Sequence, residues 1–354
     1  MIEQFYFVIT ERCNLTCSHC IRDSSPYRDE TAETGMMKNA LTQIVRSHPD
    51  SLVLLSGGEP TLHRHFLELL DFGLQLGLTI TINTNGVTSF FNEATLKELA
   101  QHARLSVQVS LDGDEAMHDA IRGPDSYRKA VRTLRKLVEN GIRCSVSTTV
   151  VDIDFMVRAD TFITSLDTLG LAHIAIKRAT YAGRAASGID VDGEKWNEHV
   201  YRLRALPTKT RLKMMPMYDF DRLDTLSDDV LSELELPPSA TNCGAGTAKV
   251  YIYTNGDVCP CTCFKDRPMG NLYLSDLDEI LAKPPTIQVK HPACNACRYF
   301  GLCRGGCLGS GYQTTGIIGA PDPRCPKVAS TDGKHERILH FGFVSGNDRD
   351  FPRG

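Results

Sequence analysis

The chain has 354 residues, longer than the roughly 250 to 300 residues at which a single hydrophobic core stops growing, so we expect two structural units. Hydrophobic residues make up 42% of the sequence and charged residues 23%, as in ordinary water-soluble globular proteins. The net charge of -4 gives no electrostatic reason to expect binding to nucleic acid or to an anionic membrane. Both partners are therefore excluded from the predicted function.

The N-terminal sequence MIEQFYFVIT lacks the basic start of a secretory signal, and no apolar run approaches the roughly twenty residues of a membrane span. We therefore expect a cytoplasmic protein, in which thiols stay reduced. Three of the 13 cysteines fall between residues 13 and 20, one is Cys144, and the rest lie between Cys243 and Cys325. In a reducing compartment, this clustering favours metal binding over disulfides.

The first part of the chain alternates β-rich segments with amphipathic helical segments, the pattern of a parallel sheet in an α/β fold. Strands are predicted at 5–9, 52–55, 78–83, 105–111, 142–151 and 172–177, and helices at 66–76, 94–100 and 127–139. The last helix should end at Asn140-Gly141. Six βα units are too few for a closed eight-stranded barrel. We therefore expect an open, partial (β/α)6 TIM-like barrel with its chemistry at the carboxyl ends of the strands.

The domain boundaries follow from changes in composition. Residues 1–215 are assigned to the barrel, and 216–240, with Pro216, Pro237 and Pro238, to an irregular linker. Residues 241–330 form a cysteine-rich C-terminal domain whose short segments are too small for a conventional core, so metal should hold them together. The charged residues 331–354 are expected to form a C-terminal tail.

Cys13, Cys17 and Cys20 directly follow the first predicted strand, with gaps of three and two residues. A [4Fe-4S] cluster needs one thiolate for each iron that it closes, so three cysteines leave one iron open to a ligand. The same cysteines with His19 could instead form a Cys3His zinc site, or act as redox-sensing thiols. The spacing favours the iron-sulfur cluster.

Further polar and glycine residues follow the next three predicted strands. Ser56-Gly57-Gly58-Glu59 comes after the second strand, where bare backbone and a carboxylate can approach an ammonium group, although a Gly-Gly turn alone indicates only a loop. Asn85 ends the third strand in an Asn-Gly pair, which is a common turn. Ser110 and Asp112 end the fourth strand, and Arg122 follows. Asp112 could instead cap a turn, and Arg122 could form a surface ion pair.

The CxxxCxxC, SGGEP and SLDG segments together resemble the radical S-adenosylmethionine (SAM) superfamily over residues 4 to about 185. This resemblance implies that the open iron binds the amino and carboxylate groups of SAM, and that one electron releases a 5'-deoxyadenosyl radical. It implies that Cys13, Cys17 and Cys20 are the catalytic cluster ligands. The implied cofactor contacts are His19, Ser56, Gly57, Gly58, Glu59, Asn85, Ser110, Asp112 and Arg122. The segment 181–185 matches a loop of the same subfamily and should line the site.

The C-terminal cysteines resemble those of the SPASM domain, which carries two auxiliary iron-sulfur clusters, for a total of three [4Fe-4S] clusters. The resemblance assigns Cys294, Cys297, Cys303 and Cys325 to the second auxiliary cluster, and Cys243, Cys261 and Cys307 to the first. Either Cys259 or Cys263 could be the missing fourth ligand, and both would share a face with Cys261 on a regular strand, which Pro260 makes doubtful. Two structural zinc sites are the alternative. Cys144 is predicted to be a small buried hydrophobe.

Because SPASM proteins mostly modify peptides, the resemblance implies a peptide substrate. We expect a maturase that abstracts hydrogen from a ribosomally made precursor peptide and forms an intramolecular carbon-carbon (cyclophane-type) or thioether crosslink. One alternative is a peptide epimerase, with Cys259 or Cys263 as the hydrogen donor. Another is a sulfatase-type formylglycine maturase. Members of that group carry an Asp, which serves as a base, directly after the second cysteine of the domain, whereas here Thr262 follows Cys261, so this alternative is disfavoured. A non-catalytic iron-sulfur electron carrier is disfavoured, because it would not need the open iron and the SAM-binding motifs SGGEP and SLDG.

The expected partners are the precursor peptide and a reductant such as flavodoxin or ferredoxin. Many crosslinking maturases begin with a module that binds the precursor's leader, whereas here the first predicted strand starts within ten residues. Leader recognition is therefore expected to need a separate leader-binding protein or the enzyme's own surface.

Overall fold

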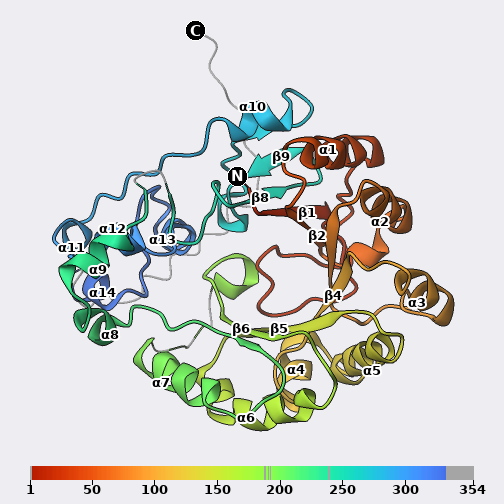
Figure 1. The fold of residues 1–354 in the computed structure, drawn as a ribbon, viewed down its shortest axis with the longest axis horizontal. Coiled ribbons are helices and arrows are strands. Elements are labelled where there is room, and N and C mark those ends of the chain that lie inside the picture. The colour runs from red at the N-terminus through yellow and green to blue at the C-terminus, as the bar shows by residue number, and fades with distance from the viewer. Residues whose placement is uncertain (1, 187–188, 190, 192, 238–239, 332–354) are drawn as a thin grey trace.

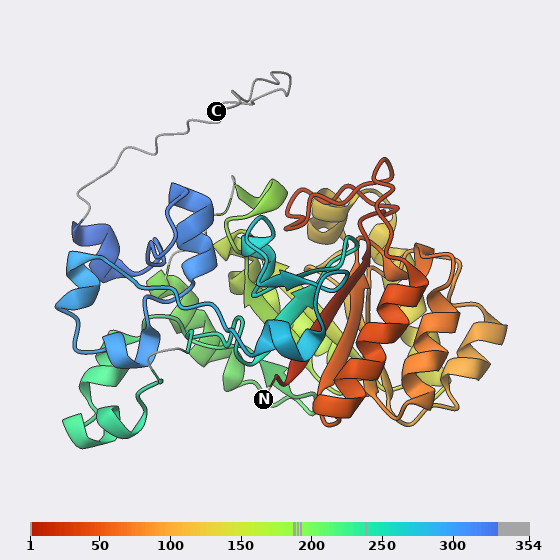
Figure 2. The same cartoon turned by 90° about the horizontal axis from the view of Figure 1, so that it is seen from above.

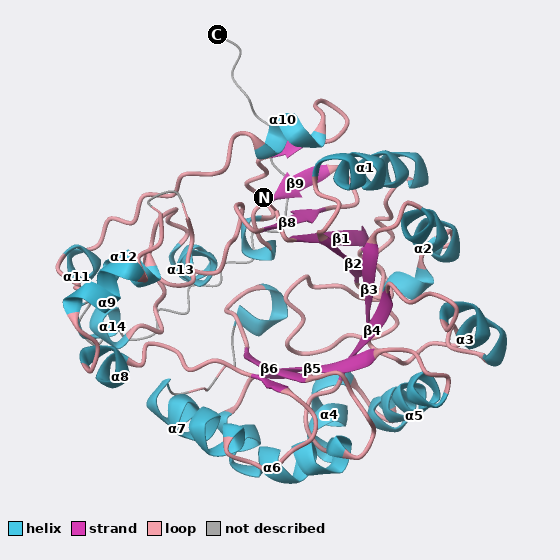
Figure 3. Cartoon of the chain, viewed as in Figure 1, coloured by secondary structure: helices cyan, strands magenta, loops and turns pink. Residues whose placement is uncertain are grey.

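The computed structural model describes residues 2–186, 189, 191, 193–237 and 240–331. Within these residues, one curved sheet forms an open barrel with helices on its outer side (Figure 1, Figure 3). The strand order is β10-β9-β8-β1-β2-β3-β4-β5-β6-β7. The strands are β1 Gln4–Thr10, β2 Leu52–Gly57, β3 Thr79–Thr84, β4 Leu105–Ser110, β5 Cys144–Val150, β6 Ile174–Arg178, β7 Leu212–Lys213, β8 Lys249–Ile252, β9 Asp257–Cys259 and β10 Gly270–Asn271.

The larger helices belong to the barrel: α1 Thr34–Ser47, α2 Phe66–Gln75, α3 Glu93–Leu99, α4 Glu115–Arg122, α5 Ser126–Glu139, α6 Ile153–Asp167 and α7 Gly193–Arg204. Shorter helices follow: α8 Phe220–Asp224, α9 Asp228–Glu233, α10 Leu277–Leu281, α11 Pro292–Asn295, α12 Phe300–Cys303, α13 Leu308–Thr315 and α14 Pro326–Thr331. Three 3-10 turns occur among the described residues, at Pro60–Leu62, Gly183–Ala186 and Thr262–Phe264. No helix in the described part of the chain is long and apolar enough to cross a membrane.

Alternation along the strands gives the sheet two different faces. In β4, Leu105, Val107 and Val109 are buried in the core, while Ser106 and Gln108 point to the opposite face. On that face the Ser106 hydroxyl lies 2.8 Å from the hydroxyl of Thr81 on β3. Closed eight-stranded barrels fill their interior with branched apolar side chains. The inner face of this open barrel is polar at these strands.

The predicted partial barrel is confirmed, and each of its six predicted strands is present with ends shifted by a few residues. The helix predicted at 127–139 is α5, which ends at Asn140 and is followed by Gly141 with φ +71°. Cys144 is buried in the core, as predicted. The predicted elements do not include β7, which has only two residues, or α1, α4, α6 and α7. The residue before α1, Glu33, makes no capping hydrogen bond.

Part of the C-terminal region extends the barrel sheet. β8 pairs in parallel with β1, from Lys249 beside Gln4 to Ile252 beside Phe7, and Figure 2 shows these two strands side by side. Val250 from β8 joins the main hydrophobic core, as do apolar residues of β9 and α10. This stretch therefore adds to the core of the barrel and does not build a separate core of its own.

The segment 216–240 was expected to be irregular, yet it contains α8 and α9. Helix α9 begins after Ser227, whose hydroxyl accepts a hydrogen bond from the backbone N–H of Val230 (3.4 Å). Both helices have only one or two turns, too short for the hydrophobic periodicity that predicts a helix from sequence. The tail expected at 331–354 lies, from residue 332 onwards, outside the described residues.

Candidate active site and cysteine clusters

The loop after β1 brings Cys13, Cys17 and Cys20 together. Cys13 and Cys17 are 7% and 8% exposed. Burial raises the pKa of the Cys13 thiol to about 12, and the neighbouring groups Glu59, Cys17 and Cys20 act in the same direction. Burial also raises the pKa of Cys17, with Cys20 again close enough to contribute. Bound iron would be needed to hold these crowded thiols as thiolates.

Gly57 and Gly58 let the end of β2 contact the start of this loop. The backbone N–H of Gly58 donates to the carbonyl oxygen of Thr10 (2.7 Å), and that of Glu59 donates to the carbonyl oxygen of Arg12 (2.9 Å). A Cβ atom at Gly57 would lie 2.3 Å from the Thr10 carbonyl oxygen, and one at Gly58 would lie 2.3 Å from that of Arg12. Only glycine fits such an approach. The Gly-Gly pair therefore does more than form a loop.

Glu59 is fully buried, and its carboxylate joins the ends of β2 and β3. Its Oε1 accepts hydrogen bonds from the hydroxyls of Thr61 (2.7 Å) and Thr84 (2.9 Å), and its Oε2 accepts from the backbone N–H of Asn85 (2.8 Å). Burial raises the pKa of Glu59, although these donors favour the charged form. The carboxylate is thus held in place and is positioned beside Cys13.

Asn85 connects Glu59 to the cysteine loop. Its side-chain Nδ2 donates to the Asn14 side chain (2.9 Å) and lies 3.7 Å from the Cys13 sulfur. The Asn-Gly pair alone indicates a common turn. The structure brings this asparagine against one of the three clustered thiols.

Asp112 is the centre of a buried polar network at the end of β4. Its carboxylate accepts from Nε2 of His19 (2.8 Å), from Nε of Arg122 (2.6 Å) and from the backbone N–H of Thr149 (2.8 Å). Burial by itself would raise the pKa of Asp112, but the charge of Arg122 and the hydrogen bond from His19 hold it well below its usual range. The Arg122 side chain is 10% exposed, so the alternative of a surface ion pair is wrong. Ser110, the last residue of β4, is half-buried.

This donor set fits a site-differentiated cluster with SAM on its open iron. Three thiols converge from one loop, the buried Glu59 carboxylate lies beside one of them, and Nδ1 of His19 is buried without a hydrogen-bond partner among the described residues. Over the same residues, no group of three or more His, Cys, Asp or Glu side chains is gathered around a single-ion site. A cubane cluster differs in that each thiolate binds its own iron.

A second group of thiols lines one cavity of the C-terminal region. Its cysteines are Cys294, Cys297, Cys303 and Cys325, the four assigned to one auxiliary cluster. Burial, with the nearby thiols of Cys303, Cys325 and Cys297, raises the pKa of Cys294 to about 11. Four cysteines, from α11, the segment that joins it to α12, α12 itself and the loop before α14, match the ligand requirement of a [4Fe-4S] cluster.

A third group contains Cys261, Cys263 and Cys307. The backbone N–H of Cys263 donates to the Cys261 sulfur (3.2 Å), and the interaction between the two thiols lowers the pKa of Cys261 to about 7. The same interaction and burial raise the pKa of Cys263, and Cys307 acts in the same direction. Cys243 lies on an exposed loop before β8, and its neighbour Asn242 lines a cavity with Cys307.

Cys259 is near Cys261 but differs from this group in its surroundings. It ends β9, is fully buried beside Val8 and Tyr253, and its sulfur lies 3.7 Å from the Lys265 carbonyl oxygen. After Pro260 the chain enters a 3-10 turn that Cys261 caps. The arrangement in which all three neighbouring cysteines share one strand face is therefore not formed, because the strand ends at the first of them.

Comparison with known proteins places this geometry in a family. Residues 7–156 match the radical SAM superfamily, and residues 243–307 match the SPASM iron-sulfur cluster-binding domain. The mycofactocin maturase MftC of Mycobacterium ulcerans is 30% identical over 338 residues, covering 90% of this chain and 86% of MftC. The chain belongs to the radical SAM superfamily. It is a radical SAM enzyme of the SPASM group, with a SAM site and iron-sulfur clusters.

Other members of the superfamily are also similar to this radical SAM enzyme. An AdoMet-dependent heme synthase of Oleidesulfovibrio alaskensis is 27% identical over 343 residues, covering 90% of this chain and 85% of the synthase. The crystal structure of Streptococcus suis SuiB bound to precursor peptide SuiA superimposes with a TM-score of 0.75 at 16% identity, covering 93% of this chain and 76% of SuiB. The SuiB likeness shows the shared fold.

Arg184 is a residue of this radical SAM enzyme whose role the sequence did not reveal. It lies in the segment 181–185, which was predicted only to line the site. Its guanidinium donates to the carbonyl oxygens of Cys17 (2.8 Å) and Ser24 (2.8 Å), and its backbone N–H donates to that of Cys20 (3.0 Å). Arg184 therefore braces the cysteine loop from the end of β6. An arginine that binds carbonyl groups distant in sequence leaves no local signal.

His118 makes the stability of this radical SAM enzyme depend on pH. The ring is fully buried, its Nδ1 accepts from the Asp112 backbone N–H (3.1 Å), and burial together with the Arg122 charge lowers the pKa of His118 to about 4. An unfolded histidine titrates near 6.5. Stability from this group is therefore complete above pH 6.5 and is lost as pH falls towards 4, by about 1.4 kcal/mol per pH unit.

Anaerobic urea unfolding at pH 7.5 and 5.5 measures this effect. We expect the His118→Gln variant to lose less stability than the unsubstituted protein between the two values. His102→Gln, a change at a half-buried histidine outside the network, is the control and should keep the full loss. An unchanged pH dependence in His118→Gln would contradict the assignment.

Proposed function

We propose that this enzyme abstracts a hydrogen atom from a ribosomally made precursor peptide and forms an intramolecular carbon-carbon (cyclophane-type) or thioether crosslink. The similarity to MftC along 90% of the chain is the observation that carries the proposal. The shared fold with SuiB, which was crystallised with its precursor peptide, supports a peptide substrate. The missing Asp after Cys261 favours a crosslink over formylglycine formation.

In this proposal the barrel residues bind and orient the cofactor. Cys13, Cys17 and Cys20 hold the radical SAM cluster, and Glu59 and the network of Asp112 with Arg122 position SAM. When bound, the cluster and SAM together supply a radical that removes hydrogen from carbon. The remaining proposed contacts are His19, Ser56, Gly57, Gly58, Asn85 and Ser110. Glu59 and Asp112 are themselves buried, so water has little access to these two carboxylates.

Crosslinking removes two hydrogens from the peptide. One would leave as a hydrogen atom and the second as a proton as the new bond forms between the two positions, and an auxiliary cluster, when bound, would accept the remaining electron. We propose two such clusters, one held by Cys294, Cys297, Cys303 and Cys325, and one held by Cys243, Cys261, Cys263 and Cys307. A reductant of the flavodoxin or ferredoxin class would supply the electron that starts each cycle.

We propose Cys263 rather than Cys259 as the fourth ligand of the first auxiliary cluster, because Cys263 contacts Cys261, whereas Cys259 is fully buried beside Val8 and Tyr253. The Cys263→Ala variant should lose one cluster, so that reconstituted protein holds about eight irons instead of about twelve. Cys259→Ala is the matched control and should keep all of them. Iron and sulfide analysis measures both, and the reverse pattern would exchange the two assignments.

The function is tested with the peptide encoded beside the enzyme. Reduced, reconstituted protein with SAM should convert this peptide to a product lighter by two hydrogens, and tandem mass spectrometry should show suppressed fragmentation between the crosslinked residues. Formylglycine formation would leave fragmentation uninterrupted. Epimerisation would leave the mass unchanged but incorporate deuterium from heavy water. Addition of a leader-binding protein encoded nearby tests the separate partner.

The similarity to a heme synthase supports a second candidate, a porphyrin substrate. Incubation of the same protein with a heme precursor tests this second candidate. A modified porphyrin would support it, and a modified peptide would support the first proposal. A non-catalytic electron carrier would release no 5'-deoxyadenosine with either substrate. The peptide proposal fails if the peptide keeps its mass and takes up no deuterium while 5'-deoxyadenosine is released.

A further inference from the structure

Tyr218, Asp322 and Arg324 form a buried polar network between the auxiliary cysteine groups. The Tyr218 hydroxyl donates to Oδ2 of Asp322 (2.6 Å). The Arg324 guanidinium makes two hydrogen bonds to the same carboxylate, from Nε to Oδ1 (2.8 Å) and from Nη2 to Oδ2 (2.7 Å). The side chains of Asp322 and Arg324 are 0% and 5% exposed. The network is therefore a bidentate ion pair shielded from water, with a tyrosine as third member.

Asp322 connects the chain segments that carry cysteines of both groups. Its side chain accepts a hydrogen bond from the backbone N–H of Cys307 (3.3 Å), and its own N–H donates to the carbonyl oxygen of Gly305 (2.9 Å). The backbone N–H of Cys325 donates to the Asp322 carbonyl oxygen (3.1 Å). Cys307 belongs to the proposed first auxiliary cluster, and Cys325 belongs to the second. One residue thus fixes the position of a ligand from each cluster.

Arg324 and Tyr218 extend the network to the barrel and to the segment before α8. Arg324 Nη1 donates to the carbonyl oxygen of Ala179, just after β6 (3.2 Å). Tyr218 has φ +52°, a left-handed conformation that bulky residues rarely adopt, and a Cβ atom at Gly306 would lie 2.1 Å from its hydroxyl oxygen. The tyrosine is thus fitted closely against the glycine that precedes Cys307.

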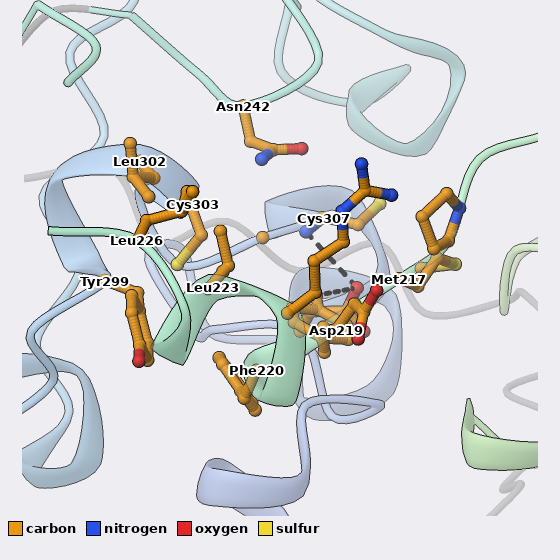
Figure 4. Close-up of a pocket in the computed structure, with 15 residues that line it drawn as sticks. Met217, Asp219, Phe220, Leu223, Leu226, Asn242, Tyr299, Leu302, Cys303 and Cys307 are labelled. Carbon is orange, nitrogen blue, oxygen red and sulfur yellow. Dashed lines mark hydrogen bonds between the residues drawn. The ribbon is translucent and has the colours of Figure 1, made fainter. Parts of the chain in front are cut away.

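The network borders a cavity of about 410 Å³ that contains thiols from both groups. Tyr218 and Asp322 line it together with Cys303 and Cys307. Figure 4 shows Cys303 and Cys307 among the residues that line the cavity, with two dashed hydrogen bonds meeting at one carboxylate oxygen. Tyr218 also lines the cavity that holds Cys294, Cys297, Cys303 and Cys325. The network therefore lies at the boundary of the two proposed cluster sites.

The charges of the pair act on the cysteines of both groups. Burial raises the pKa of Cys307, Asp322 raises it further, and Arg324 lowers it. Arg324 also acts on Cys263, and Asp322 acts on Cys325. Both charges reach Cys307, where their effects oppose each other.

We propose that the Asp322–Arg324 ion pair sets the reduction potentials of the auxiliary clusters. Its two opposite charges act on the clusters in opposite directions, and Tyr218 holds the pair in position. The proposal rests on the auxiliary ligands given under the proposed function. Reduction adds negative charge to a cluster, so an isolated carboxylate nearby disfavours reduction and an isolated guanidinium favours it. A network that only stabilises the fold would not give shifts of opposite sign.

The test measures the auxiliary cluster potentials by an anaerobic redox titration followed by electron paramagnetic resonance, without peptide. Arg324→Gln should lower the potential of the first auxiliary cluster, and Asp322→Asn should raise it. The double variant, which removes both charges, should return close to the unsubstituted value. Arg324→Lys keeps the charge and should shift the potential least. Arg298→Gln breaks an ion pair of the same region between half-exposed and exposed side chains, and is the matched control.

The potential and the function fail separately in this design. Shifts in the same direction for Arg324→Gln and Asp322→Asn, or unchanged potentials in variants with full iron content, would overturn the proposal. Protein that binds only about four irons would overturn it together with the proposed auxiliary clusters. Opposite shifts support it even if no peptide is converted, because the titration contains no substrate.

Discussion

Replacing Cys13, Cys17 and Cys20 together by alanine is expected to reduce the release of 5'-deoxyadenosine to the background level. The three thiols converge in one loop and would provide the three ligands that leave one iron open. Reconstituted variant should hold about eight irons rather than about twelve, because the C-terminal cysteines are untouched. High-performance liquid chromatography of the nucleoside products and iron analysis measure the two effects.

Cys144→Ala is the control for this cysteine series. Cys144 lies in the hydrophobic core at 3% exposed, on a strand rather than in the cysteine loop. The variant should lose some stability but keep all of its iron and its cofactor cleavage. If the triple variant still cleaved SAM at an appreciable rate, the radical site would have to lie elsewhere in the molecule.

Replacing Asp112 by alanine is expected to lower the free energy of unfolding by about 3 to 5 kcal/mol, the usual effect of leaving a buried charge without its partner. Asp112 provides the carboxylate beside the buried Arg122, and it also holds His19 and the backbone of β5. The same change should weaken SAM binding, because two of the proposed SAM contacts, His19 and Arg122, lose their hydrogen bonds to this carboxylate. Anaerobic chemical unfolding and equilibrium dialysis with SAM measure these two effects.

Asp112→Asn separates charge from shape. Asparagine keeps an oxygen for the Thr149 N–H and places a neutral amide beside Arg122, so the stability loss should be smaller than for alanine. Lys97→Ala removes an exposed ion pair with Glu93 and should leave the free energy of unfolding nearly unchanged. A stability loss in Asp112→Ala no larger than this control would show that Arg122 finds another partner.

The sequence predicted the elements of the site that depend on local order. The cysteine spacing and the glycines after β2 are contiguous motifs at strand ends, and parallel strands bring their carboxyl ends to one edge. The contacts that hold the motifs together were not predictable in this way. Arg184 binds the loop at Cys17 over a long sequence separation, and the sequence did not show that the partner of Arg122 is the buried Asp112. Only the fold brings these groups together.

The C-terminal region shows the same limit for larger elements. Its cysteine spacing indicated metal clusters, but β8 to β10 are two to four residues long and carry no reliable periodicity. Their place is decided by the edge of β1, which offers unpaired backbone groups and an apolar core beside it. The sequence also did not show which of Cys259 and Cys263 lies against Cys261. The turn that follows Cys259 brings Cys261 and Cys263 into contact.

The pairing of β8 with β1 means that the barrel and the cysteine-rich region cannot be exchanged as independent modules. A chimera joined within residues 216–240 would replace the neighbour of the strand that leads directly into Cys13, and would have to reproduce its hydrogen-bond register from Gln4 to Phe7. A junction placed after Asn271, the end of β10, would keep the host's own sheet intact. Recombination between relatives should therefore preserve activity more often at the second junction than at the first.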